Sequence, residues 1–354
     1  MIGYYAHHQG SGHVIRLGAI ASELDGPVTG LSSLPAPTGW QGDWVQLAPD
    51  DDEDAVTRDC SANGVLHWAP TFDAGLRRRT RQIVEWIERA DPDLLVTDVS
   101  VEVSLLARLC GVPVVVMAMP GDRLDRPHRT AYDLADHLLA AWPRGALTDP
   151  WPQTWLDKTW YVGGISRFDA TNSPLLREFA ASRGRNVVVL WGAGGRATTD
   201  EQVFAAMNAT PDWRWTDIGT KATASQVWRH LSQADVVVAH AGQNVVAEVA
   251  AARRPAVIVA EPRPHDEQLA TVRALNRLGL AVGLYSWPDA ECWPDLLSAA
   301  QRIGGAKWTR WSRGGSARAA RLIAERAAHL RLARSQPRCS GGAPQLAVRL
   351  AAQP

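Results

Sequence analysis

Hydrophobic residues fall in short runs separated by longer amphipathic segments along the whole chain. Runs of strand length cover residues 2–6, 45–47, 94–96, 112–117, 186–190, 213–216, 236–239, 256–260 and 281–284. Helix-like segments lie between them over 13–24, 73–90, 101–109, 129–141, 199–208, 225–233, 245–253, 265–278, 289–303 and 314–330. This alternation of strand and helix predicts an α/β protein with parallel sheets covered by helices.

The alternation is interrupted once, which divides the chain into two parts. Residues 142–158 are rich in Pro and Trp and lack periodicity, and the glycine pair Gly163-Gly164 follows them. We therefore expect two Rossmann-like, doubly wound domains, over 1–160 and 161–314, that face each other across a cleft. A last helix over 315–333 is expected to pack back on the first domain, and residues 336–354 to form a disordered tail. Ligands of such sheets bind at the carboxyl ends of the strands, so the cleft is the expected site.

Composition excludes several classes of function. The chain has 37 Lys and Arg against 37 Asp and Glu, which argues against a nucleic-acid-binding protein. Its four cysteines lie far apart without a CxxC or Cys/His spacing, so neither a zinc site nor a disulfide framework is indicated. No apolar run approaches the roughly 20 residues that span a bilayer, and residues 1–6 lack the features of a signal peptide. We expect a cytoplasmic protein; the arginine-rich run at 77–81 leaves peripheral membrane contact open.

Candidate chemistry in the first half lies where two strands end. Gly10, Ser11 and Gly12 follow the first strand and precede a helix that opens with His13. The two glycines allow a ligand to approach the backbone, and the helix start offers free N–H groups to an anion. His13 has the side chain best suited to a general base, and Asp98, after the strand at 94–96, is its candidate partner. Asp98 is equally consistent with an Asx turn or a helix cap.

The second half carries two polar loops of the same kind. Gly192, Gly194 and Gly195 follow a strand and precede a helix, an arrangement suited to holding a diphosphate on backbone N–H groups. The stretch 234–248 is a strand, a His240-Ala241-Gly242 loop and a helix with a single carboxylate, Glu248, in its first two turns. A carboxylate in that position can accept two hydrogen bonds from a ribose diol.

This second stretch resembles the C-terminal domain of MurG-like glycosyltransferases, most strongly over 234–279. The shared features are the His240–Gly242 loop, Glu248, a strand led by Pro255, and the pair Glu267-Gln268 at a helix start. The resemblance implies that Glu248 holds the donor ribose and that Glu267 and Gln268 hold the donor sugar. It places the remaining donor-binding residues in the loops around the nucleotide: Gly12, Gly192, Gly194, Gly195, Ile218 at the base, His240, Gly242, Gln243 and Asn244.

The resemblance implies a hexosyltransferase of the GT-B type that moves a sugar from a nucleotide diphosphate, a UDP-sugar by family, to a small-molecule or lipid-linked acceptor. We expect inversion at the sugar, with His13 as the base and Asp98 as its partner. No DxD motif stands in a suitable context, so we expect neither a metal ion nor a cofactor.

Three other functions of the same fold stay open. A nucleotide-sugar hydrolase is one, because the segment from Gly12 to Arg16 also resembles hydrolases whose histidine activates water. A nucleotide-sugar epimerase would need further acid and base carboxylates. A non-catalytic partner subunit is the third, although it would have no reason to retain His13, Glu248 and Gln268 together.

Overall fold

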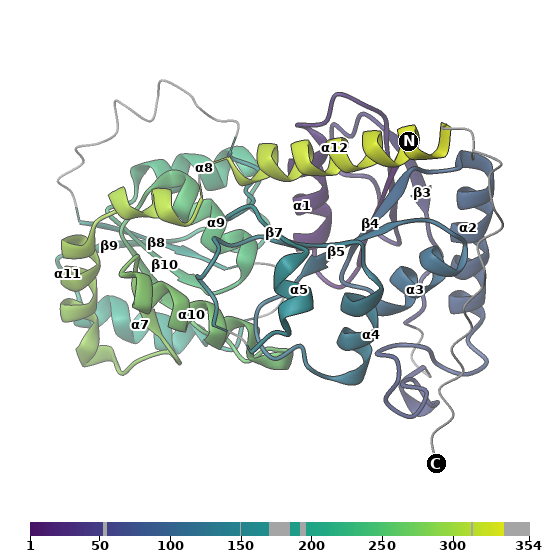
Figure 1. The fold of residues 1–354 in the computed structure, drawn as a ribbon. Coiled ribbons are helices and arrows are strands. Elements are labelled where there is room, and N and C mark those ends of the chain that lie inside the picture. The colour runs from purple at the N-terminus through teal and green to yellow at the C-terminus, as the bar shows by residue number, and fades with distance from the viewer. Residues whose placement is uncertain (52–54, 149, 170–184, 192–195, 313, 336–354) are drawn as a thin grey trace, which may run out of the picture.

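Two parallel β-sheets, each with helices on both faces, lie side by side along the molecule (Figure 1). The computed structural model describes residues 1–51, 55–148, 150–169, 185–191, 196–312 and 314–335. The predicted fold class, two Rossmann-like α/β units, is confirmed by these two sheets.

The first sheet has seven strands in the order β3-β2-β1-β4-β5-β6-β7. They are β1 (Ile2–Ala6), β2 (Val28–Ser32), β3 (Asp43–Gln46), β4 (Leu94–Asp98), β5 (Val114–Ala118), β6 (His137–Ala140) and β7 (Thr159–Tyr161). The helices are α1 (Gly12–Ala21), α2 (Ala74–Ala90), α3 (Val101–Leu109), α4 (Arg126–Leu134) and α5 (Gln153–Asp157), with a 3₁₀ turn at Ala55–Thr57. Alternate strand residues face opposite layers: Tyr4 packs in one core with Leu17 of α1, and Tyr5 in another with Ile83 of α2.

The second sheet has five strands in the order β12-β11-β10-β8-β9. They are β8 (Asn186–Leu190), β9 (Arg214–Asp217), β10 (Val236–His240), β11 (Ala256–Val259) and β12 (Val282–Leu284). Its helices are α7 (Asp200–Ala209), α8 (Ala224–Gln233), α9 (Gln243–Ala252), α10 (Glu267–Leu278) and α11 (Trp293–Ile303), with 3₁₀ turns at Pro264–Asp266, Ala290–Cys292 and Ala306–Arg310. The central β10 is a run of valines buried on both sides, as a covered parallel strand requires.

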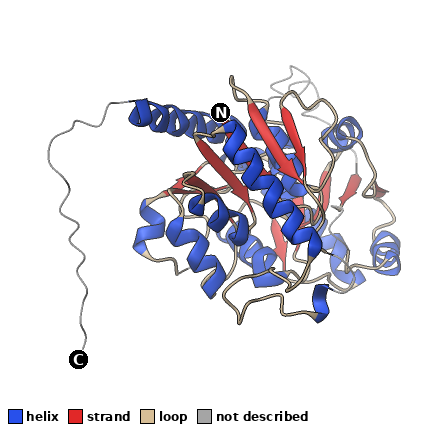
Figure 2. Cartoon of the chain, turned by 90° about the vertical axis from the view of Figure 1, so that its right-hand side faces the viewer, coloured by secondary structure: helices blue, strands red, loops and turns tan. Residues whose placement is uncertain are grey.

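Helix α12 (Gly315–Ser335) joins the two halves from the outside, running from the second sheet across to the first (Figure 1). Figure 2 views the molecule from the side of the first sheet, where helices surround the strands. Ala319, Ala320 and Ile323 are fully buried and share a core with β1, β4 and α1. Farther along the helix, Arg331 contacts the carboxylate of Asp93 at 2.7 Å. The predicted domain limits stay predictions, and the tail at 336–354 lies outside the described residues.

The sequence interpretation was wrong at one helix and missed several elements. The segment 129–141 is not one helix: α4 ends at Leu134, Ala135 is extended (φ −63°, ψ 138°), and strand β6 follows. No Gly or Pro marks this break; the neighbouring β5 and β7 supply the pairing that makes residues 137–140 a strand. β2, β7 and α5 were also missed, because each is short and lies beside turn-forming or Trp-rich sequence.

No helix among the described residues is both long enough and apolar enough to cross a membrane.

Candidate functional site

A cavity of about 810 Å³ lies between the two sheets and is lined by both halves of the chain. The loops that follow β1, β4 and β5 form one wall, and those that follow β9, β10 and β11 form the other. These are the carboxyl ends of the strands, where ligands of open parallel sheets bind.

His13 and Asp98 meet in the first wall. Asp98 is the last residue of β4, paired with the end of β1, and His13 is the second residue of α1. His13 Nδ1 lies 2.9 Å from Asp98 Oδ1. The Asp98 side chain is inaccessible to solvent, while that of His13 is 17% exposed and lines the cavity. The histidine therefore faces the ligand space with the carboxylate behind it.

Two further side chains hold Asp98. Arg16 Nε and Nη2 donate to its two oxygens at 2.8 and 2.5 Å, and the Tyr4 hydroxyl donates to Oδ2 at 3.1 Å. Burial by itself raises the pKa of Asp98, but the Arg16 guanidinium and His13 outweigh it and hold the pKa well below its usual range. A carboxylate that stays ionised only accepts hydrogen bonds, so His13 donates from Nδ1 to Asp98, and Nε2 is the ring nitrogen that this contact leaves available.

Asp98 does not cap helix α3. Ser100 does so, since its side chain accepts a hydrogen bond from Val103 N at 3.1 Å. Between them Val99 has φ +61°, an unfavourable conformation for a β-branched residue. Val99 lines the cavity, so this strained turn belongs to the site.

The start of α9 contacts the start of α1 across the cavity. Gln243 Oε1 accepts from Arg16 Nη1 at 2.8 Å, and Asn244 Nδ2 donates to the carbonyl oxygen of Gly12 at 2.7 Å. A Cβ on Gly12 would lie 3.0 Å from that Asn244 nitrogen. Both predicted donor residues therefore also connect the two halves.

Gly242 precedes α9 and leaves the helix N-terminus without a side-chain cap. Its N–H donates to His240 Nδ1 at 3.0 Å, and a Cβ there would lie 2.4 Å from the His240 ring. His240 is largely buried, and that burial lowers its pKa to about 4. His240 is thus a neutral ring beside an uncapped helix start, which attracts anions.

Glu248 is 4% exposed, lines the cavity and contacts one cation. Arg167 Nε lies 2.8 Å from Glu248 Oε1. Burial raises the pKa of Glu248, and Arg167 only partly opposes that effect. The carboxylate is therefore held less firmly than Asp98.

The other predicted donor residues occupy different environments. Glu267 lines the cavity, with Oε2 3.3 Å from Arg123 Nη2. Gln268 is buried outside the lining, where its Oε1 accepts from the backbone of Ala241 and Glu261. Ile218 packs against the core and its neighbour Gly219 lines the cavity. The predicted Gly192, Gly194 and Gly195 lie outside the described residues.

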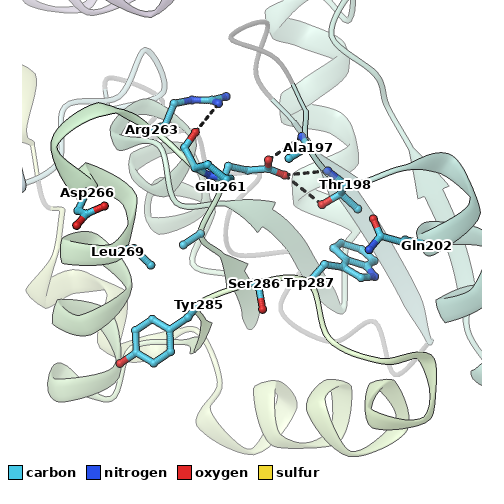
Figure 3. A pocket seen from close by; sticks show the side chains of 12 residues that line it. Ala197, Thr198, Gln202, Glu261, Arg263, Asp266, Leu269, Tyr285, Ser286 and Trp287 are labelled. Atoms are coloured by element: carbon cyan, nitrogen blue, oxygen red, sulfur yellow. Dashed lines mark hydrogen bonds between the residues drawn. The ribbon is translucent and has the colours of Figure 1, made fainter.

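The sequence interpretation missed a buried carboxylate, Glu261, which bonds described residues that precede and follow that glycine stretch. Glu261 accepts a hydrogen bond from Trp191 Nε1 at 3.0 Å. It also accepts from Ala197 N at 2.7 Å and Thr198 Oγ1 at 3.1 Å, as Figure 3 shows. Glu261 also lines a second cavity of about 420 Å³. The described residues on either side of the predicted diphosphate loop are therefore bonded to the loop that follows β11.

Tyr4, Arg16, Arg167 and Glu261 complete the site but were not predicted. Only Arg16 had a usable signal, because it lies three residues after His13 and so on the same helix face. The others depend on contacts between residues distant in the chain.

Comparison with known proteins finds a matching domain family and similar folds. Residues 161–287 match the glycosyltransferase family 28 C-terminal domain. No curated protein sequence matches the chain. Solved structures with a similar fold include MurG of Acinetobacter baumannii (16% identity, TM-score 0.58, covering 92% of this chain and 99% of that one). Two others are Arabidopsis thaliana UGT89C1 complexed with UDP (16%, 0.63, 92% and 99%) and the spinosyn rhamnosyltransferase SpnG complexed with spinosyn aglycone (14%, 0.59, 94% and 99%).

Proposed function

We propose that this chain, a MurG-like glycosyltransferase of the GT-B fold, transfers a sugar from a UDP-sugar to a hydroxyl group of a small-molecule acceptor, with inversion. The observation that carries the proposal is the ionised Asp98 behind His13, facing an uncapped helix start across one cavity. One wall thus offers a base, and the other an anion site.

His13 Nε2 takes the proton of the acceptor hydroxyl as that oxygen attacks the anomeric carbon of the donor. The new C–O bond forms on one face while the bond to the diphosphate oxygen breaks on the other, which inverts the configuration. The imidazolium that results is stabilised by Asp98, 2.9 Å from Nδ1.

The departing diphosphate gains negative charge, and the start of α9 faces it with backbone N–H groups and the positive end of the helix dipole. No divalent cation is needed on the diphosphate in this proposal. Glu248 accepts the ribose hydroxyls in place of Arg167, and Glu267 accepts a hydroxyl of the sugar.

The identity of donor and acceptor is supported by the similar structures. UGT89C1 is complexed with UDP, and Phytolacca americana UGT2 with UDP-2fluoro-glucose and pterostilbene. The calicheamicin glycosyltransferase CalG4 has the same fold at 17% identity. A small lipophilic acceptor fits the apolar part of the first wall, which includes Ile15, Val116 and Met119.

A thermal-shift screen of nucleotide diphosphates with a chelator present tests the donor assignment. We expect UDP and a UDP-sugar to stabilise the protein, by roughly 2.7 kcal/mol at a hundredfold excess over Kd. Glu248→Gln should lose most of the shift, whereas His329→Ala, an exposed residue on α12, should keep it. The donor site would be contradicted if no nucleotide raised Tm, or if Glu248→Gln gave the same Tm shift as the wild type.

Donor incubated without acceptor separates transfer from hydrolysis. Because the same His13–Asp98 pair can activate water, a hydrolase would release free sugar at the full rate without acceptor. A transferase should release it at a small fraction of the rate seen with acceptor.

A further inference from the structure

Three histidines and an aspartate from both halves of the chain meet beside the cavity. They are His67, Asp125, His128 and His265, and one side-chain nitrogen or oxygen from each lies within 4.8 Å of those of the others. The three histidines line the cavity. None of the four has a role in the proposed transfer.

Asp125 is at the centre of this cluster. Its Oδ1 lies 3.3 Å from His67 Nε2, and its Oδ2 lies 3.5 Å from His265 Nδ1. Zinc binds imidazole nitrogen and carboxylate oxygen at about 2.0–2.2 Å in a tetrahedron, which separates ligand atoms by about 3.3 Å. The two separations, one at each carboxylate oxygen of Asp125, are each close to that spacing.

His128 supports the carboxylate. Its Nε2 lies 3.2 Å from Arg123 Nη1, and its Nδ1 lies 2.5 Å from Asp125 Oδ2. A guanidinium only donates hydrogen bonds, so Nε2 accepts and Nδ1 carries the proton that it gives to Asp125. The Arg123 charge is balanced by Glu267, 3.3 Å away. This leaves His67, Asp125 and His265 as ligands.

The backbone holds the ligands in place from both halves. His265 has φ +61° and ψ 19°, a conformation uncommon outside glycine, and its carbonyl oxygen accepts from Asp122 N at 2.9 Å. A Cβ at Gly121 would lie 2.0 Å from that oxygen. His67 N donates to Glu102 Oε1 at 2.8 Å. The β5–α4 loop of the first half therefore lies directly against the His265 turn of the second.

We propose that the chain binds one Zn²⁺ ion through His67 Nε2, His265 Nδ1 and the Asp125 carboxylate. His128 orients Asp125, and the fourth coordination position faces the cavity. The ion joins the two halves of the chain, since His265 comes from the second and the other ligands from the first. This departs from the absence of metal expected from the sequence, and it does not rest on the proposed transfer.

Titration of chelator-stripped full-length protein with Zn²⁺ by calorimetry tests the proposal. We expect one ion per chain, a rise in Tm with Zn²⁺, and visible absorption typical of tetrahedral Co²⁺ when Co²⁺ replaces Zn²⁺. His67→Ala and His265→Asn should each weaken Zn²⁺ binding at least 100-fold; asparagine is chosen because it tolerates positive φ. His128→Ala should weaken binding about 10- to 100-fold, as loss of an orienting partner does.

His329→Ala is the matched control and should bind Zn²⁺ as the wild type does, because His329 lies on α12 away from the cluster. Equal affinity in the wild type, His67→Ala and His265→Asn would overturn the proposal, as would no uptake of Zn²⁺ by the wild type. UDP binding by the stripped protein reports on the transferase proposal separately.

Discussion

The two walls of the cavity hold their functional carboxylates in opposite ways. In the first wall Asp98 is fully buried and accepts hydrogen bonds from Arg16, Tyr4 and His13. In the second, the buried Glu248 contacts the cation of Arg167. The pKa of Asp98 is lowered by its partners, whereas the pKa of Glu248 is raised by burial. The carboxylate of the first wall therefore has its hydrogen-bond partners before any ligand binds. The carboxylate of the second wall has one cationic partner and can accept further hydrogen bonds from a ligand.

Replacing Asp98 should have the largest effect. Asp98→Asn leaves the buried Arg16 without its counter-charge, which typically costs about 3–5 kcal/mol of stability. It also lets His13 take the wrong tautomer, so we expect kcat to fall by roughly 10⁴. Urea unfolding and initial rates measure the two effects. Wild-type stability and rate in Asp98→Asn would show that the carboxylate does not organise this wall.

The partners of Asp98 should also affect how the stability of the protein depends on pH. Because the folded pKa of Asp98 is depressed, its contribution is complete above the unfolded pKa, about 3.9, and is lost as pH falls through the folded value. Unfolding followed between pH 6 and pH 2 should therefore show a steeper loss below about pH 4 in the wild type than in Asp98→Asn. If stability fell with pH equally in the wild type and in Asp98→Asn, the ion pair of Asp98 and Arg16 would not contribute to stability.

Removing the base should lower the rate of transfer and leave donor binding unchanged. His13→Ala is expected to lower kcat by about 10²–10⁴, the usual contribution of a general base, with little change in UDP affinity. Single-turnover rates and nucleotide titration separate the two quantities, and His329→Ala serves as the control. If His13→Ala turns over at the wild-type rate, another group must accept the proton.

Glu248→Gln should show the reverse pattern. Loss of a hydrogen bond to a charged group costs about 1.5–3 kcal/mol, so UDP affinity should fall about 10- to 100-fold. The free protein should be as stable as the wild type or more so, because burial disfavours the charged carboxylate and Arg167 is partly exposed to solvent. Nucleotide titration and Tm measure both. A large loss of stability in Glu248→Gln would show that Glu248, like Asp98, stabilises the free protein.

The parts of the fold that could be predicted are those with a strong local pattern. The valine run of β10 and the periodicity of α2 and α10 mark buried strands and amphipathic helices from the residues alone. By contrast, β6 follows α4 with no breaker and is a strand because β5 and β7 pair with it. Short strands of this kind depend on tertiary contacts more than on local preference.

The candidate site divides in the same way. His13 and Asp98 stand at a helix start and a strand end, so chain position placed them near the cleft; Glu248, within the first two turns of α9, was assigned with the help of the family resemblance. Tyr4, 94 residues from Asp98, and Glu261, 70 residues from Trp191, have no such signal. The histidine cluster was missed for the same reason, because His67 and His265 have no local metal-binding spacing.

The smallest effect is expected where the two walls touch. Asn244→Ala removes the hydrogen bond from Nδ2 to the Gly12 carbonyl, 2.7 Å long, which should cost about 1 kcal/mol of stability. Because this contact joins the walls and is not itself a proton-transfer group, kcat should fall less than threefold while KM for the donor rises. Steady-state kinetics beside His329→Ala, an exposed residue of α12, provide the comparison. A fall in kcat as large as that of His13→Ala would mean that Asn244 contacts the reacting atoms. The catalytic groups would then lie in both walls and not in the first wall alone.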